Sequence, residues 1–114
     1  TLKSGGMAGI LPDQVPSNGE GVWAPFFGKQ AYTMTFPLRL IRQFKAVVVM
    51  ARSERIPEGW HVSWKIWDEE LTGDDAQDAA LMNRLIEETV LECPHQYLWS
   101  YNRYKCPSGV QKPQ

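Results

Sequence analysis

One carboxylate stands where a buried strand should end and a long irregular loop should begin. Asp13 follows the short apolar run 7–11, which is typical of a buried strand, and it opens a loop over 12–31 that is rich in Pro and Gly. In open α/β sheets, ligands bind beyond the carboxyl ends of the strands. Asp13 is therefore a candidate for orienting a ligand or a neighbouring cation. The alternative is a turn acid in a purely structural network, where placed acids are also common.

A second polar group follows the apolar run 46–51, which also reads as a buried strand. Arg52 and Arg55 lie just beyond this run. If a helix over 33–45 joins the two strands, the pair is parallel and the crossover is right-handed. Both polar groups would then share one edge of the sheet, with an arginine near Asp13. An exposed polar loop is the alternative for the residues after 51.

The residue types most often used in catalysis and metal binding form no recognisable site. His61 lies on the more polar face of an alternating segment, and His95 follows a proline. Cys93 and Cys106 are thirteen positions apart, with no second pair and no histidine at ligand spacing. We therefore expect no metal and no cofactor. Free thiols are the simpler interpretation, although the spacing leaves a disulfide open.

The segments that carry these residues predict a mixed fold. Apolar residues at helical spacing predict a long helix over 74–93, and Thr72 with Asp75 resembles a capping box at its start. Alternation over 60–67 predicts a strand, and Pro94 suits the first turn of a second C-terminal helix. We expect an α/β fold: a partial sheet with a βαβ crossover, an added strand and a C-terminal helix pair.

Charge and hydropathy exclude several classes of protein. The net charge of −1 gives no basic excess, so we expect no nucleic-acid partner, although aromatics interleaved with Arg103 and Lys105 could stack on bases. The same residues suit a membrane interface. No apolar run is long enough to span a bilayer. The opening stretch 3–6 is similar to the last turn of a helix, which predicts a piece of a longer protein; a processed or engineered N-terminus is the alternative.

Two separated motifs resemble one enzyme family. The stretch Pro94-x-Gln96-Tyr97-x-Trp99-x-Tyr101-x-Arg103-Tyr104-Lys105 is similar to the C-terminal motif of the bacterial lipid A biosynthesis acyltransferases, the lauroyl/myristoyl family. The turn Pro12-Asp13-Gln14, the stretch 22–28 and the helix start at 32–35 resemble the same family in the same order. The resemblance covers roughly residues 2–109.

The resemblance implies an acyltransferase of the glycerolipid type. Such an enzyme moves a fatty acyl chain from an acyl carrier protein thioester to a hydroxyl of a Kdo-bearing lipid A precursor. It works at the cytoplasmic face of the inner membrane of Gram-negative bacteria. The family's catalytic histidine, a general base, is followed five positions later by an acid that orients it. Ile66 follows His61 by five positions and Ser100 follows His95 by five, so neither histidine fits.

The missing motif implies that residues 1–114 are the C-terminal portion of one acyltransferase domain. We expect this portion to hold no catalytic residue, to be soluble and inactive alone, and to end in a flexible tail over 107–114. It would supply the acceptor side of the site, with Asp13, Gln14, Arg52 and Arg55 as positioning residues. Because a carboxylate does not attract phosphate, we expect Asp13 to hold Arg52 or Arg55 in place.

The C-terminal motif is expected to be structural. Pro94, Gln96, Trp99 and Arg103 carry it, and on a helix Trp99 and Arg103 would share one face that anchors the helix to the sheet. Contact with a headgroup or the acyl donor is the alternative for these residues. Two other functions stay open: a fragment of a phospholipid acyltransferase, against which Trp99 and Arg103 argue, and a non-catalytic module that binds a membrane or a protein partner.

Overall fold

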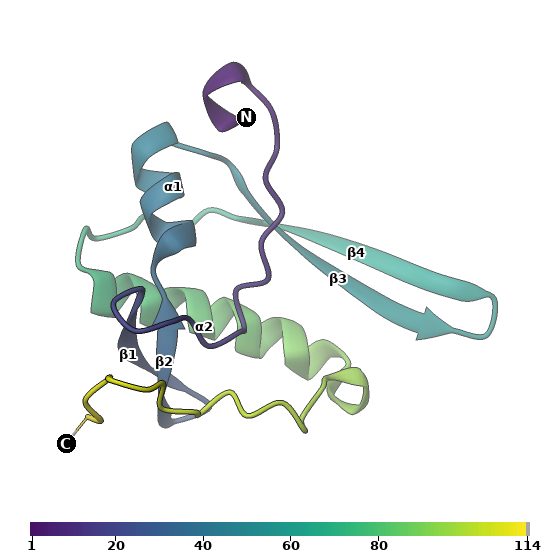
Figure 1. Ribbon diagram of the computed structural model, residues 1–114. Helices are drawn as coiled ribbons and strands as arrows, with labels where there is room; N and C mark the ends of the chain where they lie inside the picture. Colours follow the sequence, from purple (N-terminus) through teal and green to yellow (C-terminus); the bar gives the residue numbers. More distant parts are fainter. Residues whose placement is uncertain (114) are drawn as a thin grey trace.

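Two hairpins and two helices make up the fold, seen here in a computed structural model that describes residues 1–113 (Figure 1). Strands β1 (Gly21–Phe26) and β2 (Lys29–Met34) form the first hairpin, and β3 (Val48–Ile56) and β4 (Gly59–Trp67) form the second. Helix α1 (Phe36–Phe44) lies between them in sequence, and α2 (Asp75–Glu92) follows. Short 3₁₀ turns occupy Leu2–Ser4 and Pro94–Gln96. The predicted mixture of helices and strands is confirmed.

The first hairpin arises inside the stretch that the sequence assigns to a loop. Phe27 and Gly28 both have positive φ, of 51° and 77°, the backbone that a tight two-residue hairpin turn requires. Phe26 then pairs with Lys29, and the register continues to Gly21 opposite Met34. The extended piece expected within 22–27 is thus one arm of a full hairpin. Helix α1 begins at Phe36, later than the predicted start, because residue 33 belongs to β2.

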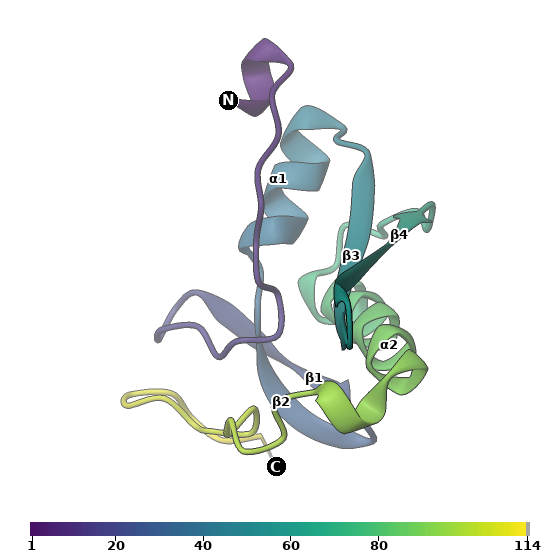
Figure 2. The same ribbon diagram turned by 90° about the vertical axis from the view of Figure 1, so that its right-hand side faces the viewer.

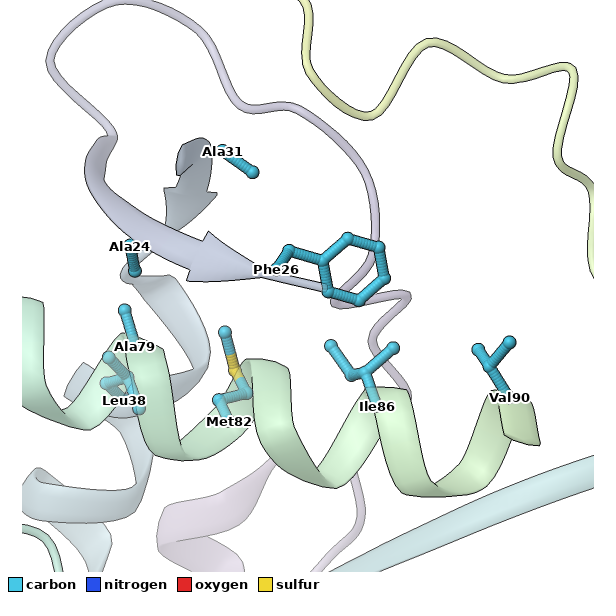
Figure 3. Close-up of a cluster of buried hydrophobic side chains, with 8 residues drawn as sticks. All are labelled: Ala24, Phe26, Ala31, Leu38, Ala79, Met82, Ile86 and Val90. Carbon is cyan, nitrogen blue, oxygen red and sulfur yellow. The ribbon is translucent and has the colours of Figure 1, made fainter. Parts of the chain in front are cut away.

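Helix α2 supplies most of the core, as its apolar periodicity predicts. Ala79, Met82, Ile86 and Val90 project from one side of α2 toward the first hairpin (Figure 3). The hairpin and α1 complete this buried cluster with Ala24, Phe26, Ala31 and Leu38. The cap differs from the prediction: the Asp74 carboxylate accepts the backbone N–H groups of residues 76 and 77.

The second hairpin contradicts the predicted βαβ crossover. β3 pairs with β4 in antiparallel register, Val48 opposite Trp67, and it makes no parallel pair within the described residues. The alternation of 48–56 continues past the apolar run, and only two residues separate it from the strand that follows. Such a short connection can join antiparallel strands but not parallel ones. Arg52 and Arg55 therefore lie within β3 and not beyond its end.

The predicted strand over 7–11 is also absent. This segment runs as irregular chain, with Met7 91% and Leu11 67% exposed. A strand needs a neighbour to satisfy its backbone groups, and within residues 1–113 each sheet contains only the two strands of one hairpin. Asp13 consequently does not stand at the end of a strand.

The predicted second C-terminal helix is reduced to the single turn Pro94–Gln96. Residues 97–113 continue as turns and irregular chain beside β1 and β2 (Figures 1 and 2). Trp99 and Arg103 therefore share no helical face: Arg103 is 3% exposed, whereas Trp99 is 56% exposed. Within the expected tail, the Trp23 indole N–H donates to the carbonyl of Gln111 at 2.9 Å. Gln114 lies outside the described residues, and the flexible tail stays a prediction.

Candidate functional site

A buried arginine ties the C-terminal segment to the first hairpin and to α2. The Arg103 guanidinium donates to the carbonyl of Tyr32 at 2.8 Å, to Oγ1 of Thr33 at 3.0 Å and to Oδ1 of Asn83 at 3.4 Å. It also lies over the ring of Phe26, 5.3 Å from the centroid. Guanidinium offers five donors in a rigid planar fork, so it can hold several acceptors at fixed angles. Arg103 therefore fixes three parts of the chain in one geometry.

Asn83 completes this network from the helix. Its side-chain amide donates to Oγ1 of Thr33 at 3.0 Å and to the carbonyl of Pro25 at 3.1 Å. Asn83 and Thr33 are both fully buried. Sequence reasoning missed Asn83, although there was a signal: it is a polar residue on the otherwise apolar side of a helix. Buried polar groups of this kind are nearly always paired.

Asp13 lies beside this network and not beside Arg52 or Arg55. Burial, followed by the negative charge of Asp13, raises the pKa of the Tyr97 hydroxyl to about 12, while the positive charge of Arg103 opposes that rise. Burial lowers the pKa of Arg103, and the acidic groups of Tyr97 and Asp13 counter it. Nearby, the backbone N–H of Val15 donates to the Tyr101 hydroxyl at 2.8 Å. The turn around Asp13 thus packs against the C-terminal motif.

The other two candidate arginines lie elsewhere, on β3. The Arg52 side chain donates to Glu92 at 3.2 Å and to Glu54 at 3.5 Å. The Arg55 guanidinium lies 5.0 Å from the ring centroid of Trp60. Arg52 thus joins β3 to the end of α2, whereas the Arg55 guanidinium stays within the second hairpin. Gln14, the remaining candidate, is exposed.

Gln96 of the C-terminal motif has a clear structural position. Its side-chain oxygen accepts the backbone N–H of Arg55 at 2.7 Å, and its amide donates to the carbonyl of Arg55 at 2.9 Å. One side chain therefore satisfies both backbone groups of a strand residue. This contact fastens the turn Pro94–Gln96 to β3.

A hollow of about 330 Å³ opens beside Arg103. Phe26 and Tyr97 line it, together with residues 99–104. The Trp99 ring stands at its rim, 4.8 Å from the ring of Tyr97 and 5.8 Å from that of Phe27, between centroids. The Trp99 indole N–H donates to the carbonyl of Pro94 at 2.7 Å. Aromatic walls with a few fixed polar groups are typical of ligand pockets.

Neither histidine has the surroundings of a general base. His61 is exposed on β4, and His95 lies near the thiol of Cys93, with Sγ 3.8 Å from Nε2. Burial and a hydrogen bond to Glu54 raise the pKa of the Cys93 thiol, so it is not an activated nucleophile. Both cysteines are free. Over residues 1–113, no group of three or more His, Cys, Asp or Glu side chains is arranged to hold a metal ion.

Comparison with known proteins accounts for the two motifs. Residues 1–106 match the family model of the bacterial lipid A biosynthesis acyltransferases. The chain belongs to this family. It is 32% identical over 114 residues to the lipid A biosynthesis lauroyltransferase of Escherichia coli K12, with 96% of the chain covered. It is 26% identical over 108 residues to the palmitoleoyltransferase of the same strain and to a lipid A biosynthesis acyltransferase of Shigella flexneri.

The chain spans only part of these relatives. It covers 37% of the length of the lauroyltransferase and 35% of each of the other two. None of the helices described in residues 1–113 is both long and apolar enough to cross a bilayer. Within residues 1–113, the two motifs meet around Arg103 and the aromatic hollow.

Proposed function

We propose that the protein containing this chain transfers a fatty acyl chain from an acyl carrier protein thioester to a hydroxyl of a Kdo-bearing lipid A precursor. The reaction would take place at the cytoplasmic face of the inner membrane of a Gram-negative bacterium. Family membership over residues 1–106 supports the reaction class. One structural observation carries the proposal: Asp13 and Arg103, from motifs at opposite ends of the chain, lie together beside a hollow.

In this proposal, residues 1–114 are the C-terminal part of the acyltransferase domain and form the acceptor side of the site. Arg103 is held by the hairpin and α2, and Asp13 balances its charge and orients its surroundings. Gln14 is grouped with Asp13 as a positioning residue because it follows Asp13 directly in the sequence. Arg52 and Arg55 lie on β3, away from the hollow beside Arg103, so they would contact a different part of the acceptor. The catalytic histidine and its acid lie outside residues 1–114.

An acyl-transfer assay tests the reaction. The full-length protein is incubated with an acyl carrier protein thioester and a Kdo-bearing lipid A precursor, and the acylated product is detected by mass spectrometry. We expect turnover by the full-length protein and none by residues 1–114, because the general base is absent. Turnover by residues 1–114 would contradict the assignment of the base. Transfer to a lysophospholipid in preference to the lipid A precursor would favour a phospholipid acyltransferase.

Asp13 gives a sharper test in the same assay. We expect Asp13→Ala in the full-length protein to lower the rate about a hundredfold, as a misplaced substrate does, with a much smaller loss of melting temperature. The matched control is Glu58→Ala, an exposed acid in the turn between β3 and β4, which should leave the rate unchanged. A loss of melting temperature in proportion to the loss of rate would make Asp13 a structural turn residue. Vesicle binding without any acyl transfer by the wild type would instead support a non-catalytic module.

A further inference from the structure

The second hairpin leaves its more apolar face exposed. This outer face carries side chains from alternate positions of β3 and β4, among them Val49, Ala51, Val62, Trp64 and Ile66. The side chains of Trp64 and Ile66 are 71% and 68% exposed. The opposite face lies against α2 and is joined to it by two charged pairs. A sheet with one face in the core normally buries its apolar side, so the outer face is the surface that a larger core would cover.

The edge of β3 that faces away from β4 carries backbone groups without a partner. Gln96 pairs with both the N–H and the carbonyl of Arg55, so these two groups point away from β4. Backbone groups alternate in direction along a strand, and those of Val49, Ala51 and Ser53 therefore point the same way. Within residues 1–113, no other strand or backbone group pairs with them. The amide of Gln96 resembles a peptide group, and it occupies only the end of this edge.

The sequence at this edge is that of an interior strand. The run 46–51 contains no charge, proline or glycine, and the register of β3 with β4 is continuous from Val48 to Ile56. Proteins protect exposed edges with charges, prolines or bulges, and this part of β3 has none of them. Continuous apolar runs are typical of strands that are buried on both faces. A sheet of two strands is also only marginally stable by itself, so β3 is suited to a further neighbour.

We propose that β3 pairs through this edge with a strand from the part of the same protein that lies outside residues 1–114, and that this part also covers the outer face. The inference rests on the proposed function, in which residues 1–114 belong to a longer acyltransferase. The chain covers 37% of the length of the lauroyltransferase, so most of a protein of that length lies outside the matched region. A lipid surface would suit the outer face but not the edge, because lipid leaves backbone groups without partners.

Amide hydrogen exchange in the full-length protein tests the pairing of the edge. The protein is diluted until light scattering gives the mass of a single chain. We expect the amides of Val49, Ala51 and Ser53 to exchange about a hundredfold more slowly than those of an open edge. Met50 and Arg52 are the internal control, because their N–H groups point toward β4 and are protected in either case. Rapid exchange at the three edge amides, with both control amides protected, would overturn the proposal.

Two other results of the same measurement would give the edge to a different occupant and would also overturn the proposal. Protection that appears only at concentrations where the protein dimerises would assign the edge to a second copy. Protection that appears only after addition of phosphatidylethanolamine and phosphatidylglycerol vesicles would assign the hairpin to a lipid surface.

A substitution tests the cover over the outer face. In the full-length protein, Ile66→Lys should lower the melting temperature by about 5 °C, because the new charge would be buried beneath the covering part. The control is Lys65→Ala on the opposite face of β4, where the side chain is 52% exposed in its pair with Glu88, and it should change the melting temperature little. Small and equal effects of the two substitutions would show that the outer face is exposed in the whole protein and would contradict the proposed cover.

The acyl-transfer assay on the same preparations separates this inference from the proposed function. If the wild type transfers acyl chains while the three edge amides exchange rapidly, the added strand is wrong and the function stands. If the edge amides are protected and no acyl transfer to the lipid A precursor occurs, the proposed function fails and the added strand stands.

Discussion

Arg103 shows how one side chain can hold the fold together and also line a hollow. Its three hydrogen bonds join a backbone carbonyl and two side-chain acceptors, one of which, Oγ1 of Thr33, also accepts from Asn83. Removing this buried charged donor takes away the bonds to the Tyr32 carbonyl and to Oδ1 of Asn83, and the cost is large because these acceptors are shielded from water; Oγ1 of Thr33 keeps its bond from the Asn83 amide. The contact between Arg103 and the Phe26 ring adds an interaction that a compact ammonium cannot reproduce with the same geometry.

We therefore expect Arg103→Lys to lower the free energy of unfolding by about 3 kcal/mol, although the charge is retained. Chemical denaturation of the full-length protein measures this change. Arg84→Lys, at an exposed position on α2, is the matched control and should change stability little. Equal and small effects of the two substitutions would show that the hydrogen-bond network around Arg103 contributes little to stability.

The charge of Asp13 can be detected through Tyr97. Burial and that charge hold the pKa of Tyr97 at about 12, above its ordinary value of 10.0. Because the folded pKa is the higher one, the stability linked to Tyr97 is present below pH 10 and is lost as pH rises through the folded pKa. We expect Asp13→Asn to lower the pKa of Tyr97, measured by NMR titration of ring-labelled tyrosine. Glu58→Gln, far along the chain in a turn, should not move it. An unchanged Tyr97 pKa in the Asp13→Asn variant would show that the charge of Asp13 does not act on Tyr97.

Sequence reasoning anticipated that Asp13 would accompany an arginine but chose the wrong ones. Arg52 and Arg55 were favoured because a parallel pair of strands would bring their ends to one edge. The antiparallel hairpin removes that edge, and the true neighbour, Arg103, is ninety positions away in sequence. Trp99 was likewise expected to be buried on a helix. The helix does not form beyond Gln96, so Trp99 is exposed and its truncation should cost far less than that of a core aromatic.

Periodicity predicted the longer helices and strands well and their pairing poorly. Helix α2 and strand β4 match the predicted ranges within about two residues. Their apolar residues recur every three to four positions in the helix and every second position in the strand, and this periodicity is a local property of the sequence. The β1–β2 hairpin was hidden because its strands are short and interrupted by Pro25, and its turn uses a non-glycine residue with positive φ. The direction of pairing in β3 depends on the two-residue turn after Ile56, which apolar spacing alone does not record.

The contact between α1 and the start of α2 depends on a buried carboxylate. Asp78 accepts the backbone N–H and the hydroxyl of Thr72, at 2.7 and 2.8 Å, and a third bond from the Gly73 N–H at 3.1 Å. It also pairs with Arg42 of α1. Burial alone would raise the pKa of Asp78, but the bonds from Arg42, Thr72 and Gly73 outweigh it and lower the pKa. Two helices and the preceding loop are thus held by one ionised side chain.

Acid should therefore weaken this contact. Since the folded pKa of Asp78 is below its ordinary value of 3.8, the linked stability is present above that value and is lost as pH falls through the folded pKa. We expect Asp78→Asn to cost on the order of 2 kcal/mol at neutral pH and progressively less below pH 3.8. Melting temperatures of both proteins across this range give the measurement. Asp74→Asn, which retains a good helix cap, should show no such convergence; a constant gap for Asp78→Asn would contradict the pairing.

At the scale of the whole molecule, the second hairpin presents an apolar surface to solvent. Val49 on β3 and Trp60, Val62, Trp64 and Ile66 on β4 lie on one face and are each at least 46% exposed. This hairpin projects beyond the first hairpin (Figure 1), and its other face is joined to α2 by the Arg52–Glu92 and Lys65–Glu88 pairs. A contiguous apolar face on a two-stranded sheet with open edges favours association with other chains.

Residues 1–114 in isolation should consequently associate as their concentration rises. Light scattering coupled to size exclusion would show a mass that increases with loading, and Ile66→Lys should reduce the increase because a charge then interrupts the apolar face. Lys65→Ile, on the opposite face of β4, is the reciprocal control and should not reduce it. A monomer at all concentrations would contradict association and would support the sequence-based expectation of a soluble chain.

The position of Arg103 has a consequence for protein synthesis. Tyr32 and Thr33 leave the ribosome early, yet the side chain that bonds to them follows 71 and 70 residues later. The first hairpin and α2 can meet while the chain is growing and can form the Asn83 bonds to Pro25 and Thr33, but the Tyr32 carbonyl and Oδ1 of Asn83 lack the Arg103 donor until the segment around residue 103 emerges. Final packing around the hollow therefore waits until the segment that carries Arg103 has been made, although much of a domain usually folds as it is synthesised. A chain that is truncated before residue 103 would lack the three hydrogen bonds of Arg103. Its core would be less tightly packed, and cellular proteases would degrade it more readily.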